Sequence, residues 1–215
     1  MAWEINVPTY RPHGSQFVHG IRGGCTLIAL AGADVRSKGL RAWVGDPHAS
    51  DPDPASVANV QAVMYRIYVD ALAHGNCAKN GAATQNQMLR EAARISLPVL
   101  DVLPFQNRAL TYGEWVPFLR KYVAHASPRP YPILVQVAQG RYLRDNETGE
   151  QDEADLYDHA ICIYGTQTDP KSPAAGGYIT LDGDNPGANE HPQIYNLDTL
   201  NNAQPISMIA FNYVR

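Results

Sequence analysis

Helix-forming patterns fill most of the first half of this 215-residue chain, and strand-forming patterns fill the second half. In the first half, apolar residues recur with the period of an α-helix, and two segments begin with the Thr-x-x-Gln or Thr-x-x-Glu pattern of a capping box. In the second half, short apolar runs are separated by turn-forming residues. This segregation predicts an α+β fold, because a doubly wound parallel sheet needs strands and helices that alternate along the chain.

Four helices are expected from their end signals. The first begins at Cys25 and ends near Gly32. The second follows Asp53 and Pro54, which fit an N-cap and a first helical position, and it stops near Gly75. The capping boxes of the other two helices lie at residues 84–87 and 111–114.

Six apolar segments predict strands. They lie at residues 97–103, 131–137, 159–165, 178–182, 193–197 and 208–211. The chain is long enough for one sizeable domain over residues 1–215. Within it we expect a helical lobe over about residues 20–125 and a strand-rich lobe over about residues 130–215.

Composition and motifs exclude several classes of function. A net charge of −4 and a pI near 5.9 give no basic surface for nucleic acid or an anionic membrane. No apolar run approaches the ~18 residues that a membrane span needs. The first six residues lack the pattern of a signal peptide, which predicts a cytoplasmic protein or one released by another route. The sequence has no zinc-protease, phosphate-loop or serine-hydrolase motif, so neither a cofactor nor a metal is expected.

The first predicted helix begins with a cysteine. Cys25 follows Gly23 and Gly24 and directly precedes an apolar run at residues 26–31. At a helix start, the helix dipole and the unpaired backbone N–H groups favour a thiolate. The two glycines would also leave room for the backbone of a substrate. These features make Cys25 a candidate nucleophile.

The other two cysteines are weaker candidates. Three cysteines without CxxC spacing argue against a disulfide framework or a zinc cluster and favour a reducing compartment. Cys162 alternates to the face of its strand opposite His159, as expected for a buried structural thiol. Cys77 lies in a turn-like loop, where a second reactive thiol is the less favoured interpretation.

A histidine and a carboxylate are placed where they could complete a site. His159 begins one predicted strand, and the next strand, at 178–182, ends at Asp182. Taken alone, a histidine at a strand end is more often a surface or structural residue than a base. Antiparallel pairing of the two strands, however, would bring Asp182 to His159, where it could fix the imidazole tautomer. Asp184 is the alternative partner, because it shares a strand face with Asp182.

The order of these segments resembles a known family. A cysteine at a helix start is followed by helices, a buried strand, a His-Ala-Ile-x-Ile-x-Gly strand and a strand ending in Asp. This order is similar to the papain fold, in particular its bacteriocin-leader (double-glycine) peptidase branch, over about residues 16–211. The resemblance implies a helical N-terminal lobe and an antiparallel C-terminal sheet. It also implies that Cys25 is the nucleophile, His159 the base and later the acid, and Asp182 the residue that orients the histidine.

The residue expected to donate to the oxyanion departs from the usual pattern of the family. The family usually places a glutamine about six residues before the cysteine, to help the backbone N–H of the cysteine hold the oxyanion. That position holds His19 in this chain, and Gln16 lies nine residues before Cys25. Both Gln16 and His19 are therefore candidates.

The function expected from this resemblance is hydrolysis of an amide bond through a thioester intermediate. The substrate would be a polypeptide or a peptidoglycan stem or cross-bridge peptide. One alternative is an NlpC-type cell-wall peptidase, although its cysteine and histidine usually lie much closer in sequence than Cys25 and His159 do. Another alternative, of a different class, is a catalytically inactive papain-like domain that binds a peptide in its groove.

Overall fold

The computed structural model describes residues 21, 24–43, 57–105, 108–123, 130–138, 159–168, 170–173, 175–182 and 193–214. In these residues the fold is α+β, as predicted, with five helices and an antiparallel sheet of six strands. None of the helices in these ranges is both long and apolar enough to span a membrane.

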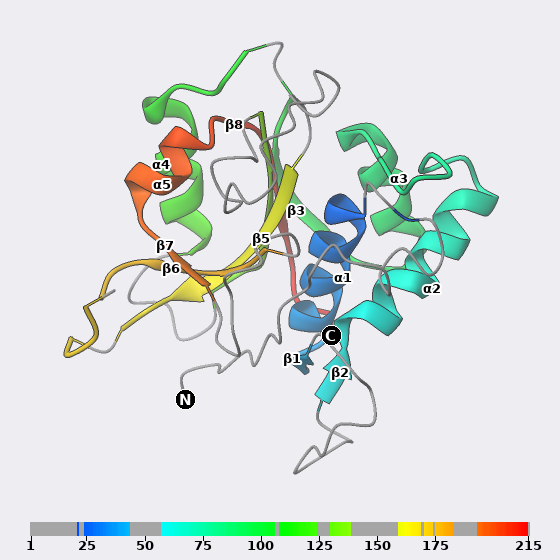
Figure 1. Ribbon diagram of the computed structural model, residues 1–215, viewed down its shortest axis with the longest axis horizontal. Coiled ribbons are helices and arrows are strands. Elements are labelled where there is room, and N and C mark those ends of the chain that lie inside the picture. Colours follow the sequence, from blue (N-terminus) through cyan, green and yellow to red (C-terminus); the bar gives the residue numbers. More distant parts are fainter. Residues whose placement is uncertain are drawn as a thin grey trace, which may run out of the picture.

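The six-stranded sheet forms the centre of the molecule (Figure 1). Its strands are β3 (Val99–Leu103), β4 (Ile133–Val137), β5 (His159–Thr166), β6 (Tyr178–Leu181), β7 (Gln193–Tyr195) and β8 (Pro205–Phe211). Their spatial order is β3-β8-β4-β5-β6-β7, so the last strand of the chain lies between β3 and β4. The consecutive strands β4, β5, β6 and β7 are neighbours in space, which brings the segment after His159 into one meander.

Helices cover both faces of the sheet. They are α1 (Cys25–Ser37), α2 (Val60–Ala73), α3 (Gln85–Arg94), α4 (Tyr112–Tyr122) and α5 (Leu197–Asn202). Helices α1 to α3 lie on one side, and α4 and α5 lie on the other (Figure 1). Ala160, Cys162 and Tyr164 of β5 join the core on the α1 side, whereas Ile161 and Ile163 join the core on the α4 side. With both faces covered, β5 is a continuous apolar run rather than an alternating one.

Helix α1 is longer than the sequence predicts. It continues past Gly32 to Ser37, and all of its residues are buried. A Cβ added at Gly32 would overlap the Tyr164 hydroxyl group and would lie 2.7 Å from Leu181 Cδ2. The glycine thus permits a close approach of α1 to the sheet and does not end the helix.

The start of the second helix was also predicted wrongly. Residues Val57–Asn59 form a short strand, β2, which pairs in parallel with β1 (Arg41–Trp43). The helix therefore begins only at Val60, because this pairing holds the preceding residues extended. The predicted cap at Asp53 and Pro54 lies outside the described residues. The helix ends at Ala73, two residues before Gly75, which has a φ of 68°.

Both predicted capping boxes are confirmed. In α3, the Thr84 side chain accepts from the Gln87 backbone N–H at 3.3 Å, and the Gln87 side chain accepts from the Thr84 N–H at 2.8 Å. In α4, Glu114 accepts from the Thr111 backbone N–H at 2.6 Å. The Arg108 guanidinium, which also bonds Glu114, holds the pKa of that carboxyl group well below its usual range.

The predicted strand at 193–197 is divided in two. Strand β7 ends at Tyr195, and the Asn196 side chain accepts from the Thr199 backbone N–H at 2.7 Å. Asparagine is a strong N-cap, and here it precedes α5, a helix not predicted from the sequence.

The edge strand β3 has a side-chain partner at its C-terminal end. Gln85 Nε2 donates to the Leu103 carbonyl at 3.1 Å, and the Phe105 N–H donates to Gln85 Oε1 at 2.8 Å. One amide side chain thus satisfies a backbone acceptor and a backbone donor at the end of this strand.

We predict that Gly32→Ala lowers the free energy of unfolding by about 1–3 kcal/mol, because the added methyl group forces α1 away from Tyr164 and Leu181. The matched control is Gly113→Ala in α4, where an added Cβ has open space. The control should be neutral or stabilising by up to about 1 kcal/mol, since alanine is the better helix former. Urea unfolding followed by circular dichroism measures both. Equal stability of the two variants would contradict the close packing at Gly32.

Candidate active site

His159 and Asp182 form a buried hydrogen-bonded pair. His159 Nε2 lies 2.6 Å from Asp182 Oδ1, and neither side chain is exposed to solvent. The register of β5 and β6 explains this contact. Cys162 pairs with Leu181, so Asp182 falls opposite Ile161 and diagonal to His159 on the same face of the sheet. The antiparallel pairing expected from the sequence therefore brings these two side chains together.

Tyr195 adds a second partner for the carboxylate. Its hydroxyl group, at the end of β7, donates to Asp182 Oδ2 at 2.8 Å, and the side chain is largely buried. Each carboxylate oxygen thus has a protein partner. In the sequence, Tyr195 is marked only as an aromatic residue within a predicted strand, which does not single it out as a site residue.

The hydrogen bond to Asp182 determines which nitrogen of His159 is basic. A carboxylate accepts a proton from Nε2, so the neutral ring carries its basic lone pair on Nδ1. The charge of the carboxylate also stabilises the protonated imidazolium ring. The pair is thus arranged to take a proton at Nδ1 and to hold the resulting positive charge.

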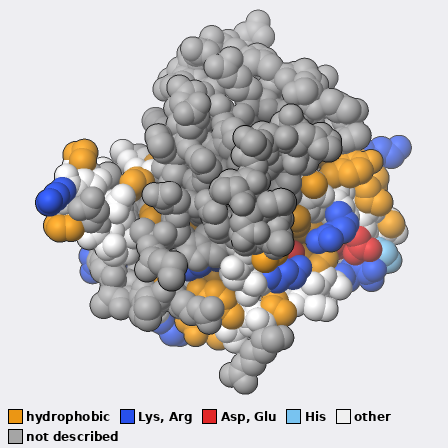
Figure 2. Space-filling view, turned by 90° about the horizontal axis from the view of Figure 1, so that it is seen from below, with side chains coloured by type: hydrophobic (Ala, Val, Ile, Leu, Met, Phe, Trp, Pro, Cys, Tyr) orange, Lys and Arg blue, Asp and Glu red, His pale blue; other side chains and the backbone are white. Residues whose placement is uncertain are grey.

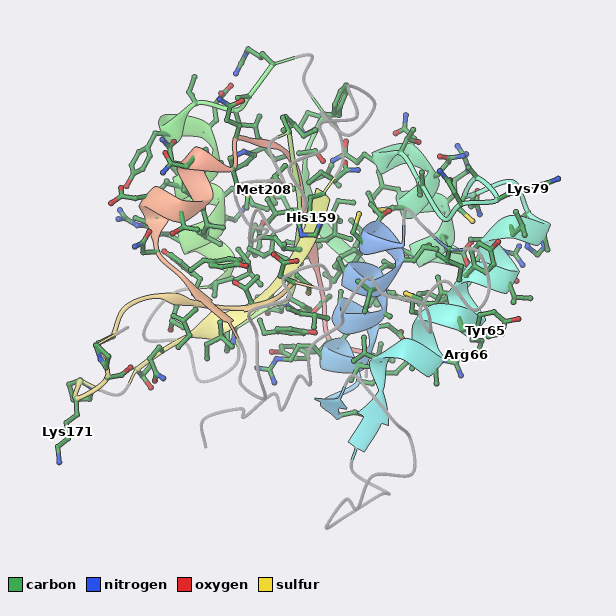
Figure 3. All side chains as sticks on the ribbon, viewed as in Figure 1. Tyr65, Arg66, Lys79, His159, Lys171 and Met208 are labelled. Carbon is green, nitrogen blue, oxygen red and sulfur yellow. The ribbon has the colours of Figure 1, made fainter. Side chains whose placement is uncertain are left out.

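Cys25 is the first residue of α1, and its side chain is 7% exposed. Helix α1 packs against β5, and Cys25 belongs to the same hydrophobic cluster as Ala160, the residue after His159. Figure 3 shows His159 at the end of β5, level with the first turn of α1. The helix and the strand thus begin at the same end of the molecule.

Strand alternation determines how the Cys25 thiol and the His159 imidazole could come into contact. Ala160 faces α1, so the Cβ of His159 leaves β5 on the opposite side of the sheet. Cys25 lies on the α1 side. The two side chains can therefore meet only around the end of the sheet, where β5 begins. His159 is suited to such a contact because it is the first residue of β5.

The glycine before Cys25 has a structural role. Gly24 is the N-cap of α1, and an added Cβ would lie 3.0 Å from Ile21 Cγ2 and 3.6 Å from Met64 Sδ. The space expected for a substrate backbone at this glycine is thus bordered by protein side chains. Gly23 lies outside the described residues.

Three other predicted site residues lie outside the described part of the chain. They are the two oxyanion candidates, Gln16 and His19, and the alternative carboxylate, Asp184. Asp182 accepts from His159 whatever the position of Asp184.

The other two cysteines are in less reactive surroundings. Burial raises the pKa of Cys162, which is fully enclosed between the sheet and α1. Burial also raises the pKa of Cys77, and the Glu91 carboxylate adds to this effect. Both groups are therefore mainly neutral thiols near pH 7, and neutral thiols are poor nucleophiles.

Neither a metal centre nor a broad charged surface stands out. In the described ranges, no cluster of three or more His, Cys, Asp or Glu side chains could hold a metal ion. On the face shown in Figure 2, the coloured Lys and Arg side chains are scattered among apolar and acidic ones. Comparisons with protein-family models, with curated proteins and with solved structures found no match.

We predict that Asp182→Asn lowers the titration midpoint of the His159 ring by about one pH unit or more, because the imidazolium ion loses its counter-charge. Tyr195→Phe should raise that midpoint by a smaller amount, because the carboxylate loses a donor and attracts the proton on His159 more strongly. Nuclear magnetic resonance of the histidine ring measures both shifts.

The control for these titrations is Tyr213→Phe. Tyr213 donates its hydroxyl proton to the Pro130 carbonyl at 2.7 Å, away from Asp182. This variant should leave the His159 midpoint unchanged. Shifts of the same sign in Asp182→Asn and Tyr195→Phe would contradict the proposed arrangement of charges.

Proposed function

We propose that this protein is a papain-like cysteine peptidase, or a closely related amide hydrolase, in which Cys25 is the nucleophile. The observation that carries the proposal is the buried hydrogen bond of 2.6 Å between His159 and Asp182. Burying an ionisable pair is costly, and such a pair at the start of a strand is more useful to catalysis than to stability. Helix α1 packs on β5, and both elements begin at the same end of the molecule. This arrangement supports Cys25 as the third member of a triad with His159 and Asp182.

The proposed reaction begins with transfer of the Cys25 proton to His159 Nδ1. The thiolate then attacks the carbonyl carbon of the amide and gives a tetrahedral oxyanion. The Cys25 backbone N–H is one donor to this oxyanion, and Gln16 or His19 would supply the other.

Collapse of the intermediate then breaks the C–N bond. The leaving amine takes its proton from His159, and a thioester remains on Cys25. Water attacks the thioester after giving a proton to His159, and the acid product leaves as the thiol is restored. Throughout the cycle, Asp182 keeps Nε2 protonated and Nδ1 available.

The proposed substrates are polypeptides and the stem or cross-bridge peptides of peptidoglycan. Both contain amide bonds of the type that a Cys-His-Asp triad cleaves. The two classes are distinguished by assay with a fluorescent casein and with purified peptidoglycan.

We predict that Cys25 reacts with iodoacetamide at pH 7 at least tenfold faster than Cys77 or Cys162, because burial raises the pKa of both other thiols. Peptide mass spectrometry gives the three rates in one sample, so the two other cysteines serve as internal controls. His159→Ala should slow the reaction of Cys25 alone. Equal rates at Cys25 and Cys77 would argue against an activated nucleophile.

We also predict that Cys25→Ala lowers hydrolysis of the preferred substrate by about a thousandfold or more, since the covalent route is lost. The matched control, Cys77→Ala, should retain hydrolysis, because Cys77 lies in the helical layer beside Tyr68 and Glu91. Release of amine product reports the rate. Full hydrolysis by Cys25→Ala would exclude Cys25 as the nucleophile.

A further inference from the structure

A buried polar pair interrupts the apolar face of the sheet that faces α1. Ser207 Oγ on β8 donates to Gln136 Oε1 on β4 at 2.5 Å, and the two residues are 0% and 4% exposed. Gln136 pairs in register with Ser207 on one side and with Ala160 on the other. The next row on this face consists only of apolar residues, namely Ile209, Leu134, Cys162 and Leu181.

Stability alone does not account for this pair. The Ser207 hydroxyl group satisfies Gln136 Oε1 and so fixes the orientation of the amide. Gln136 Nε2 meets no acceptor among the described residues, and it is not one of the buried atoms sealed from solvent there. Leucine and alanine at these two positions would fill the row without placing an amide donor on an otherwise apolar face.

The position of the pair connects it to the candidate active site. Val137, the residue after Gln136, pairs with His159, so Gln136 lies one row from the histidine, with its side chain on the opposite face of the sheet. Ala160, on the other side of Gln136, belongs to the same cluster as Cys25. The amide donor therefore faces the α1 side of the sheet, near the end where α1 and β5 both begin.

We propose that Gln136 is a substrate-binding residue and that Ser207 positions it. Gln136 Nε2 would donate to a carbonyl or carboxylate oxygen on the side chain of a substrate residue next to the cleaved amide. The substrate class is thus a peptide with a glutamine, glutamate, asparagine or aspartate residue beside that bond. This inference rests on the proposed peptidase function and adds a preference to it.

The chemistry of this donor favours oxygen acceptors of either charge. A neutral amide N–H₂ group binds both carboxamide and carboxylate oxygens, whereas a lysine or arginine would select the carboxylate alone. The small side chain of Ala160, next to Gln136 in the sheet, adds little bulk on this face. An apolar substrate side chain would exclude solvent from this donor without giving it a partner and would bind less well.

The test uses tripeptidyl vinyl sulfones, which alkylate an active-site thiol. One series carries glutamine at each position in turn, and the matched series carries leucine. The rate of Cys25 modification is measured by mass spectrometry and divided by the rate with iodoacetamide for the same variant. At one position we expect the wild-type protein to favour glutamine over leucine by about tenfold, the value of one hydrogen bond.

Two substitutions of Gln136 then test whether this residue causes the preference for glutamine. In Gln136→Leu the ratio should fall to about one, because the donor is gone. Gln136→Glu keeps the size of the side chain and presents a carboxylate, so a glutamate probe should react more slowly than the leucine probe. If leucine at position 136 prevents folding, Gln136→Glu still tests the role of the amide.

Ser207→Ala examines the positioning role. The amide loses the donor that orients it, so the preference for glutamine should fall only in part. The leucine probe forms no bond with the amide, so its normalised rate should change less than that of the glutamine probe, which separates positioning of the amide from a general structural defect.

The outcomes distinguish this inference from the proposed function. Absence of a preference in the wild-type protein, or an unchanged preference in Gln136→Leu, would overturn the role of Gln136. If no peptidyl sulfone modified Cys25 while iodoacetamide still did, the peptidase function itself would be contradicted.

Discussion

The burial of α1 is the constraint on which the rest of the structure depends. Every residue of this helix is buried, including the polar residues Asp34, Arg36 and Ser37 near its end. The sheet lies on one side of it and α2 packs against another. Gly32 brings the helix backbone close to Tyr164, so α1 has little freedom to slide or tilt. Its first residue, Cys25, is therefore held in one position relative to β5 by the packing of the whole core.

The charged part of the candidate site depends on a different layer of the protein. His159, Asp182 and Tyr195 come from the neighbouring strands β5, β6 and β7 or from the residue that follows a strand. Backbone pairing between these strands sets the relative positions of the three residues. Desolvation of the Asp182 carboxylate is offset by two hydrogen bonds, one from His159 and one from Tyr195. Such an arrangement is pre-organised, since little has to move when the imidazole takes up a proton.

Local signals predicted much of the fold, and non-local contacts explain the errors. The two capping boxes and strands β4, β5 and β6 were found because their signals lie within a few residues of one another. The contact between His159 and Asp182 followed from antiparallel pairing of adjacent strands. By contrast, the pairing of Val57–Asn59 with Arg41–Trp43 joins distant segments, and it displaced the start of α2. The position of β8 between β3 and β4 has no local signal, and Tyr195 reaches Asp182 only through the length of its side chain.

The Gln85 side chain has a consequence for how the protein meets other chains. An edge strand with free backbone groups is a template on which a strand of another molecule can add. Gln85 offers one donor and one acceptor to Leu103 and Phe105, as a neighbouring strand would. It therefore forms the two hydrogen bonds that one residue of a neighbouring strand would form. A second molecule could extend the sheet past this point only by displacing a side chain that is 8% exposed and belongs to the first turn of α3. The same amide thus already occupies two backbone groups at the end of β3 that another chain would otherwise bond.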